Sequence, residues 1–249
     1  MSLKVYMADT ANLDEERFRW LYDRVSAARR KSIDGYRFLK DKRLSLGAGV
    51  LLRVALDAYL SNGFSENATD LPEETITLEQ IDLCLLEDDI FQRTPVPVIR
   101  NGQYGKPYLK DYPEFHFNVS HSGTKVLFAC SDREVGCDIE ERPREVEGIV
   151  KRCFTTEEQK AYFGAGERRS DVFIAIWTRK ESYLKAIGVG LHEELSRVSV
   201  MDEDGNGKLS AEGLSTEGRI IKTAYTDDGY CYSICYRKKD GADDASSNK

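Results

Sequence analysis

Several features that would narrow the function at once are missing from this sequence. The six cysteines include no Cys-x-x-Cys pair, so a zinc site or a small disulfide scaffold has little support, and reduced thiols are expected. No stretch approaches the roughly 18 uncharged apolar residues of a membrane helix. Residues 1–9 alternate like a strand and carry no basic segment followed by an apolar run, so we expect no secretory signal. These absences favour a cytoplasmic protein outside the membrane.

Excess positive charge is missing as well. The chain has 36 basic and 43 acidic residues, a net charge of −7, which argues against general nucleic-acid binding. The charge is unevenly placed, because residues 24–43 hold eight basic and two acidic residues, whereas residues 54–92 hold ten acidic residues and no Lys or Arg. The basic segment suggests a local anionic partner, although on charge alone a solvated helix face is the better interpretation.

The 249 residues can form one large or two small domains, and their patterns predict mixed α and β structure. Apolar spacing and turn signals predict helices at 14–30, 41–61, 156–163 and 171–186. They predict strands at 4–8, 75–85, 95–100, 114–119, 125–130 and 135–140, with three or four more after residue 190. A seam is expected near 110–113, and the polar tail at 239–249 is expected to be disordered.

Two short stretches place polar side chains at strand ends. In the first, Ser120-His121-Ser122-Gly123, a histidine beside two hydroxyls can donate to a phosphate oxygen, although taken alone a turn histidine satisfied by its neighbours is the commoner case. A Ser-His hydrolase is disfavoured, because adjacent residues on a strand point to opposite faces. In the second, Asp138 and Glu140 share a strand face, where an ion such as Mg²⁺ would relieve their repulsion. An exposed face of ordinary acids is the alternative.

The third stretch is the helix that contains Trp177-Thr178-Arg179-Lys180-Glu181-Ser182-Tyr183-Leu184-Lys185. Its spacing puts Glu181 and Lys185 together at the edge of the apolar stripe, where a partly buried acid needs a partner. A surface ion pair is the simpler alternative to a third metal ligand beside a phosphate-binding lysine. Residues 202–209 imitate the start of a calcium loop, but Gly213 stands where the bidentate Glu belongs, so a β-hairpin turn is predicted there.

Together these stretches resemble the 4′-phosphopantetheinyl transferase superfamily, specifically its larger Sfp type. The shared elements are Ser-His-Ser, then Gly-x-Asp-x-Glu at 136–140, then Trp-x-x-Lys-Glu-Ser-x-x-Lys at 177–185, with a Gly-Lys-Pro turn at 105–107 upstream. Four motifs in the same order make a strong signal. The resemblance implies an α+β fold of two similar halves related by a pseudo-twofold axis, with the active site in the cleft between them. We expect the halves at 1–112 and 113–238, the second carrying the metal and most coenzyme A contacts.

The resemblance also implies a reaction. Such an enzyme transfers the 4′-phosphopantetheine group of coenzyme A to a serine of an apo acyl or peptidyl carrier protein and releases adenosine 3′,5′-bisphosphate, with Mg²⁺ or Mn²⁺. It implies a monomer, while the net charge and the lack of a long apolar stretch lead us to expect no nucleic-acid or membrane partner. The pathway that is served stays open. A coenzyme A or nucleotide-binding module without turnover is the competing interpretation, and retention of the three carboxylates and Lys185 argues against it.

Site residues follow from the matched motifs. Those carried over as metal ligands are Asp138, Glu140 and Glu181, and those carried over as catalytic are Glu181, Lys185 and His121. Those carried over as coenzyme A contacts are Lys31, Arg43, Lys106, Ser120, His121 and Lys185. Glu181 is the leading candidate for the base that deprotonates the serine. Leu44 stands where the family often has a hydroxyl residue, and Arg29 and Arg30 are alternatives to Lys31.

Overall fold

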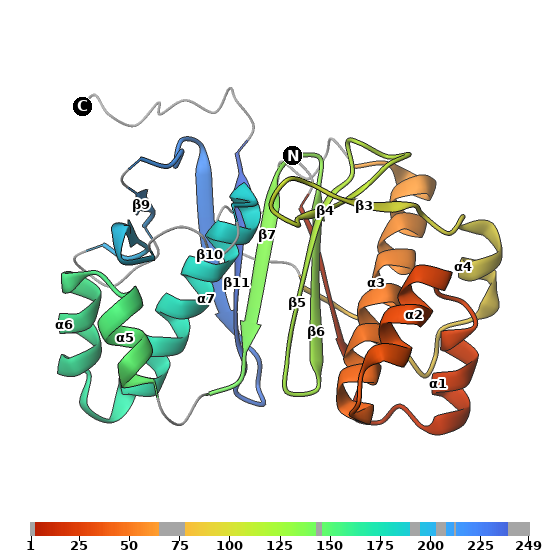
Figure 1. The fold of residues 1–249 in the computed structure, drawn as a ribbon, viewed down its shortest axis with the longest axis horizontal. Coiled ribbons are helices and arrows are strands. Elements are labelled where there is room, and N and C mark those ends of the chain that lie inside the picture. The colour runs from red at the N-terminus through yellow and green to blue at the C-terminus, as the bar shows by residue number, and fades with distance from the viewer. Residues whose placement is uncertain are drawn as a thin grey trace.

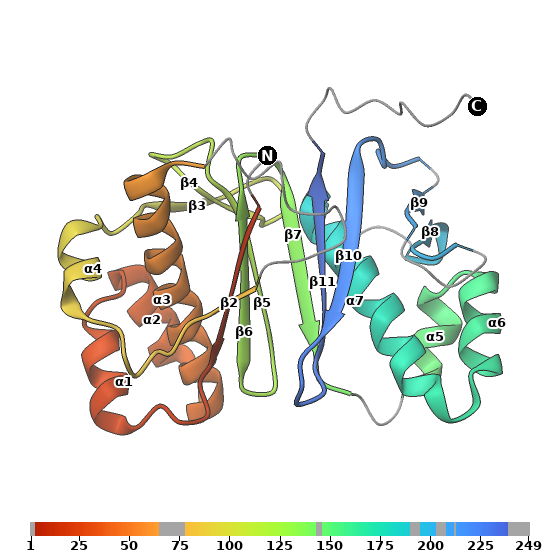
Figure 2. The same ribbon diagram turned by 180° about the vertical axis from the view of Figure 1, so that it is seen from behind.

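The computed structural model describes residues 3–64, 78–142, 146–189, 195–202, 208–211 and 213–238. Its secondary structure is mixed, and two β-sheets lie in the middle with helices on both outer sides (Figure 1, Figure 2). The predicted α+β class is confirmed. The tail at 239–249, predicted to be disordered, lies outside the described residues.

The N-terminal half begins with β1 (Lys4–Asp9) and continues through α1 (Glu15–Tyr22), α2 (Ala27–Gly35) and the long α3 (Leu39–Asn62). The short elements β2 (Leu78–Gln80), α4 (Asp88–Arg93), β3 (Ile99–Asn101) and β4 (Pro107–Leu109) follow. The hairpin of β5 (His116–Ser122) and β6 (Lys125–Ser131) completes a sheet of order β2-β1-β6-β5, in which β6 runs antiparallel to β1.

The C-terminal half repeats this plan. It begins with β7 (Val135–Glu140) and continues through α5 (Glu147–Cys153), α6 (Thr156–Gly164) and the long α7 (Arg169–Ile187). After β8 (Val198–Ser199) and β9 (Ser210–Ala211), the hairpin of β10 (Arg219–Tyr225) and β11 (Cys231–Arg237) closes the sheet β10-β11-β7. Here β11 runs antiparallel to β7, as β6 does to β1.

The sheet topology differs from the expected boundary between residues 112 and 113. Strand β6 pairs with β1 and β5 pairs with β6, so residues 116–131 belong to the N-terminal sheet. Residues 110–113 instead connect β4 to the first strand of that sheet's hairpin. We propose that the halves meet between β6 and β7, near residues 132–134.

The strand alternation divides the core into three parts. Residues such as Tyr6 and Phe128 face α3, and Cys231 and Cys235 face α7. Their neighbours in sequence, among them Met7, Leu127 and Ile139, form a third apolar layer between the two sheets. Each sheet is thus covered by its own long helix on one side and by the other sheet on the other.

Helix ends explain where the sequence prediction missed. The predicted helix at 14–30 is two helices, because Ser26 starts α2 by accepting a hydrogen bond from the Arg29 backbone N–H. The predicted helix at 156–163 is α6, which begins with a capping box between Thr155 and Glu158. Of the strand predicted at 75–85, residues 78–85 are described; 78–80 form β2, and Asp82 turns the chain just after it. Helices α4 and α5 were not predicted.

Two further predictions concern membrane-spanning segments and the hairpin turn at residues 202–209. Among the described residues, α3 is the one helix long and apolar enough to cross a membrane, yet 78% of its most apolar window is buried, as in the core helix of a globular protein. The loop at 203–207, which resembles a calcium site, lies outside the described residues. Its flanks β8 and β9 pair as antiparallel strands, in agreement with the predicted hairpin.

Candidate active site

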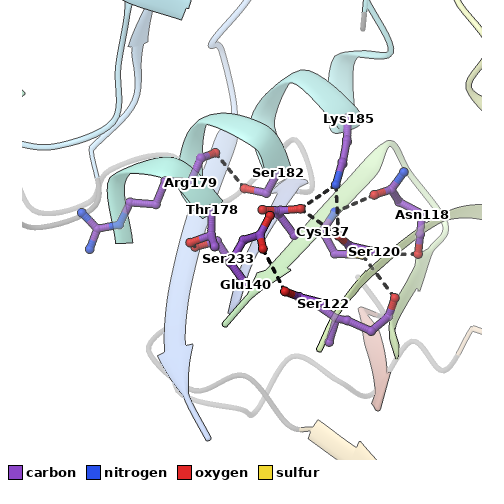
Figure 3. Close-up of polar contacts among 12 residues, drawn as sticks. Asn118, Ser120, Ser122, Cys137, Glu140, Thr178, Arg179, Ser182, Lys185 and Ser233 are labelled. Atoms are coloured by element: carbon purple, nitrogen blue, oxygen red, sulfur yellow. Dashed lines mark hydrogen bonds and ion pairs between the residues drawn. The ribbon is translucent and has the colours of Figure 1, made fainter. Parts of the chain in front are cut away.

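Strands β5 and β7 bring two rows of polar side chains together. The Ser120 hydroxyl donates to Asp138 Oδ1 at 2.8 Å, and the Ser122 hydroxyl donates to Glu140 Oε2 at 2.9 Å (Figure 3). Both pairs are offset by two residues, the spacing at which strand side chains share a face. Serines from the N-terminal half therefore hold the two carboxylates of the C-terminal half.

Helix α7 adds Glu181 and Lys185 to this face. The Lys185 ammonium lies 2.5 Å from Asp138 Oδ1 and donates to the Ser120 hydroxyl at 3.1 Å (Figure 3). The helix comes this close because β7 has Gly136 beneath it, where a Cβ atom would lie 2.1 Å from the Ser182 carbonyl oxygen and 2.3 Å from the Ala186 nitrogen. The backbones of α7 and β7 are thus in direct contact, and any side chain at residue 136 would push them apart.

Burial sets the charge state of the three acids. Desolvation raises the pKa of Asp138, although Lys185 opposes the shift. Desolvation and the charge of Asp138 also raise the pKa of Glu140, and they raise that of Glu181 to about 7. Desolvation lowers the pKa of Lys185, but the Asp138 carboxylate outweighs it, and the net shift is upward. The carboxylates are thus short of compensating positive charge.

The donor set fits an oxygen-preferring cation. Asp138 Oδ2 and Glu181 Oε1 are buried and have no hydrogen-bond partner. A buried carboxylate oxygen without a partner is costly, and a divalent ion such as Mg²⁺ would satisfy both oxygens. Within the described part of the chain, however, no group of three His, Cys, Asp or Glu side chains already stands at metal-binding distances. The three predicted ligands surround one region without forming a finished coordination sphere.

His121 lies beside this cluster at the end of β5, with an exposed side chain. Desolvation by the surrounding protein lowers its pKa; Lys185 and Arg29 lower it further, and Asp41 opposes them. These interactions place His121 within electrostatic reach of α2, of the start of α3 and of α7. A neutral imidazole among cations is suited to donate to an anionic ligand.

The other predicted coenzyme A contacts come from α2, from α3 and from the turn before β4. Lys31 is exposed on α2, and Arg43 is half-buried in the first turns of α3, where its Nε is buried without a hydrogen-bond partner. Lys106 donates to the carbonyl oxygens of Val135 at 3.1 Å and Ala186 at 2.6 Å. The structure therefore brings Ser120 and Lys185 into the cluster and directs the Lys106 ammonium elsewhere.

Part of the basic segment at 24–43 serves the N-terminal half itself. Arg24 pairs with Asp88 at 2.6 Å and stacks on Trp20. Arg30 donates to the carbonyl oxygens of residues 23 and 25, which end α1. Neither a fully solvated face nor a purely ligand-binding one describes this segment, because these arginines hold α1, α2 and α4 together.

Two residues of the site were given no role in the sequence analysis. Ser122 holds Glu140 and also accepts a hydrogen bond from the Glu141 backbone N–H. The Trp177 indole donates to Glu140, which lowers the pKa of that acid against the effect of burial. The signal for Ser122 was its spacing of two from Ser120, which matches that of the two acids. Nothing in the sequence pattern pairs Trp177 with a residue on β7.

Comparison with known proteins assigns the chain to a family. Residues 134–235, from β7 to β11, match the model of the 4′-phosphopantetheinyl transferase superfamily. The 4′-phosphopantetheinyl transferase psf-1 of Bacillus pumilus is 29% identical over 97% of this chain and 93% of that protein. The 4′-phosphopantetheinyl transferase Sfp of Bacillus subtilis (strain 168) is 35% identical over 57% of this chain and 64% of its own length. The 4′-phosphopantetheinyl transferase gsp of Aneurinibacillus migulanus is 30% identical over 72% of this chain and 63% of its own length.

Among solved structures, the holo-[acyl-carrier-protein] synthase of Thermotoga maritima is 20% identical and covers 43% of this chain and 63% of its own, with a TM-score of 0.36. A TM-score this low carries no argument about fold or function. The family model and the sequence relatives do, and they agree with the motifs that meet at β5, β7 and α7. The chain therefore belongs to the 4′-phosphopantetheinyl transferase superfamily, as an enzyme of the Sfp type.

Proposed function

We propose that this enzyme transfers the 4′-phosphopantetheine group of coenzyme A to a serine of an apo acyl or peptidyl carrier protein, in a reaction that depends on Mg²⁺. Adenosine 3′,5′-bisphosphate is the leaving product. The observation that carries the proposal is the cluster at the meeting of the halves, where two buried carboxylate oxygens without partners lie beside Lys185. Such a cluster suits phosphoryl transfer, which depends mainly on positioning and charge neutralisation.

Asp138, Glu140 and Glu181 are the residues that would hold the metal. When bound, Mg²⁺ supplies neutralisation of the pyrophosphate charge and of the leaving phosphate. Ser120 and Ser122 orient the first two carboxylates, since each donates one hydrogen bond to one of them. Lys185, whose pKa is raised, stays protonated at neutral pH and contacts the phosphates as a cation.

The acceptor serine must lose its proton as its oxygen attacks the phosphorus next to pantetheine. Glu181 is proposed as the base, because desolvation and Asp138 raise its pKa to about 7, close to neutral pH. Metal binding would make this carboxylate less basic, so the proton acceptor in the loaded enzyme is either Glu181 itself or a water that it orients. The bond between the phosphorus and the bridging oxygen breaks as the new serine ester forms.

Ser120 and His121 are proposed to hold the 3′-phosphate end of coenzyme A, with Lys31 and Arg43 adding positive charge from α2 and α3. The unpartnered Arg43 Nε supports this assignment, since a buried donor without an acceptor suits an anionic ligand. We further propose a monomer, because one chain supplies both faces of the site. We also propose that the protein is cytoplasmic and has no nucleic-acid or membrane partner, in keeping with its net charge of −7.

The proposal is tested by incubating the protein with coenzyme A, Mg²⁺ and several apo carrier proteins, and by measuring the intact mass of each carrier. A gain of one phosphopantetheine group that is lost when a chelator is added supports the proposal. The Glu181→Gln variant should lose transfer while it keeps most of its affinity for coenzyme A. A protein that binds coenzyme A but modifies no carrier would favour the binding-module alternative.

A further inference from the structure

Lys106 joins three elements that belong to different halves. It directly precedes β4, after a turn closed by a hydrogen bond from the Gly102 N–H to the Lys106 carbonyl oxygen at 2.9 Å. From there its ammonium reaches the C-terminal half and donates to Ala186 at the end of α7 and to Val135 at the start of β7. One side chain of the N-terminal half thus contacts both elements that carry the carboxylates.

Both carbonyl oxygens gain from this contact. Ala186 lies in the last turn of α7, where carbonyl oxygens have no partner within the helix and the helix dipole favours a cation. The helix ends at Gly188, which has a φ of +75° and lies against the lysine stem: a Cβ there would lie 3.1 Å from Lys106 Cδ. The lysine therefore caps α7 where the helix terminates.

We propose that Lys106 is a positioning residue, which holds the end of α7 against β7 so that Lys185 and Glu181 meet Asp138. Lys185 immediately precedes the carbonyl group that Lys106 caps, and Asp138 lies three residues beyond the other one. The family resemblance assigns Lys106 to the nucleotide, whereas its donors here are directed to backbone acceptors. As far as catalysis is concerned, this inference rests on the proposed function.

The surroundings of the ammonium support the assignment. Burial lowers the pKa of Lys106 to about 8, and the nearby charge of Arg219 adds to this, while Glu134 opposes it. The ionisable groups that face it come from β5, β7, β10, β11 and the turn before β7: His116, Cys137, Arg219, Cys235 and Glu134. A lysine whose ammonium group extended into solvent to bind a phosphate would not be desolvated in this way.

The test compares the wild type with Lys106→Met, which keeps the apolar stem, and with the control Lys110→Met, an exposed lysine just after β4. Urea unfolding is followed from pH 7 to pH 10. Because the folded pKa lies below the unfolded value of 10.5, the unfolded chain binds the extra proton between pH 8 and 10.5, and the wild type gains stability there. The unfolding constant of the wild type relative to Lys106→Met should fall by up to about tenfold per pH unit, and Lys110→Met should show no such trend.

Binding and turnover complete the test. We expect Lys106→Met to bind adenosine 3′,5′-bisphosphate within threefold of the wild type, and its kcat to fall at least tenfold at temperatures where circular dichroism shows it folded. A pH trend identical to that of Lys110→Met, or an affinity for the nucleotide reduced tenfold or more, would overturn the inference in favour of a nucleotide contact. A wild type that neither binds the nucleotide nor modifies carriers would refute the proposed function, and the unfolding series would still test Lys106.

Discussion

Replacing Gly136 by alanine tests how closely the site depends on backbone contact between α7 and β7. The added Cβ would lie 2.1 Å from the Ser182 carbonyl oxygen and 2.3 Å from the Ala186 nitrogen. Ordinary van der Waals contact begins at about 3.4 Å, so helix and strand must separate by about 1 Å. Neither obstacle is the flexible end of a side chain, so the backbone itself has to move.

This separation acts on both stability and catalysis. Overpacking of this kind costs about 1–3 kcal/mol in the free energy of unfolding. The 2.5 Å contact between the Lys185 ammonium and Asp138 Oδ1 would lengthen beyond hydrogen-bond range. A misplacement of about 1 Å can cost about 100-fold in rate, so we expect kcat for carrier modification to fall by about that factor.

The matched control is Gly148→Ala in α5, where an added Cβ meets nothing within 4 Å. Alanine is favoured over glycine in a helix, so this variant should be as stable as the wild type or slightly more stable, with unchanged kcat. Urea unfolding and single-turnover transfer to a carrier protein are measured on both variants. Wild-type stability and rate in Gly136→Ala would show that α7 does not depend on this contact, and the account of the site would be wrong.

Three further predictions concern Glu181, the Lys180–Glu158 ion pair and Ser122. The pKa of Glu181 is raised from 4.5 to about 7, so without metal the wild type should lose stability relative to Glu181→Gln as the pH rises through this window. The expected loss is about 1–3 kcal/mol after allowance for partial exposure, and a stability difference between the two proteins that is the same at pH 4.5 and pH 8 would contradict this. Lys180 and Glu158 form a fully buried ion pair at 2.7 Å, so Lys180→Met should destabilise by about 3–5 kcal/mol in urea unfolding, and Glu158→Met/Lys180→Met by less. Ser122→Ala removes one hydrogen bond to Glu140 and should weaken Mn²⁺ binding, measured by titration calorimetry, whereas the exposed Ser32→Ala should leave it unchanged.

The sequence predicted best those features that depend on residues close together in the chain. Alternation in 135–140 predicted β7 with its bounds, and the spacing of Asp138 and Glu140 predicted their shared face. The serines that hold them come from β5, and that pairing depends on how two sheets pack. Local pattern carries no information on such contacts.

Lys106 is a second residue whose contacts could not be predicted from the local sequence. Its motif was recognised, but the direction of its ammonium depends on where α7 ends and where β7 begins. The boundary that we propose between the halves, near residues 132–134, differs from the expected one for a similar reason. The expected seam at 110–113 precedes residues 116–131, yet β6 in this segment pairs with β1, more than 100 residues earlier in the chain.

The repeated plan of the two halves has a consequence for how the molecule divides its tasks. Where β1 faces its long helix it offers the apolar side chains Tyr6 and Ala8, whereas β7 offers Gly136, Asp138 and Glu140 at the matching layer. The second half thus has polar site residues where the first half has apolar core residues, and the first half supports the site mainly through its packing. Amide hydrogen exchange should accordingly be slower along α3 than along α7, although the two helices hold corresponding places in the two halves.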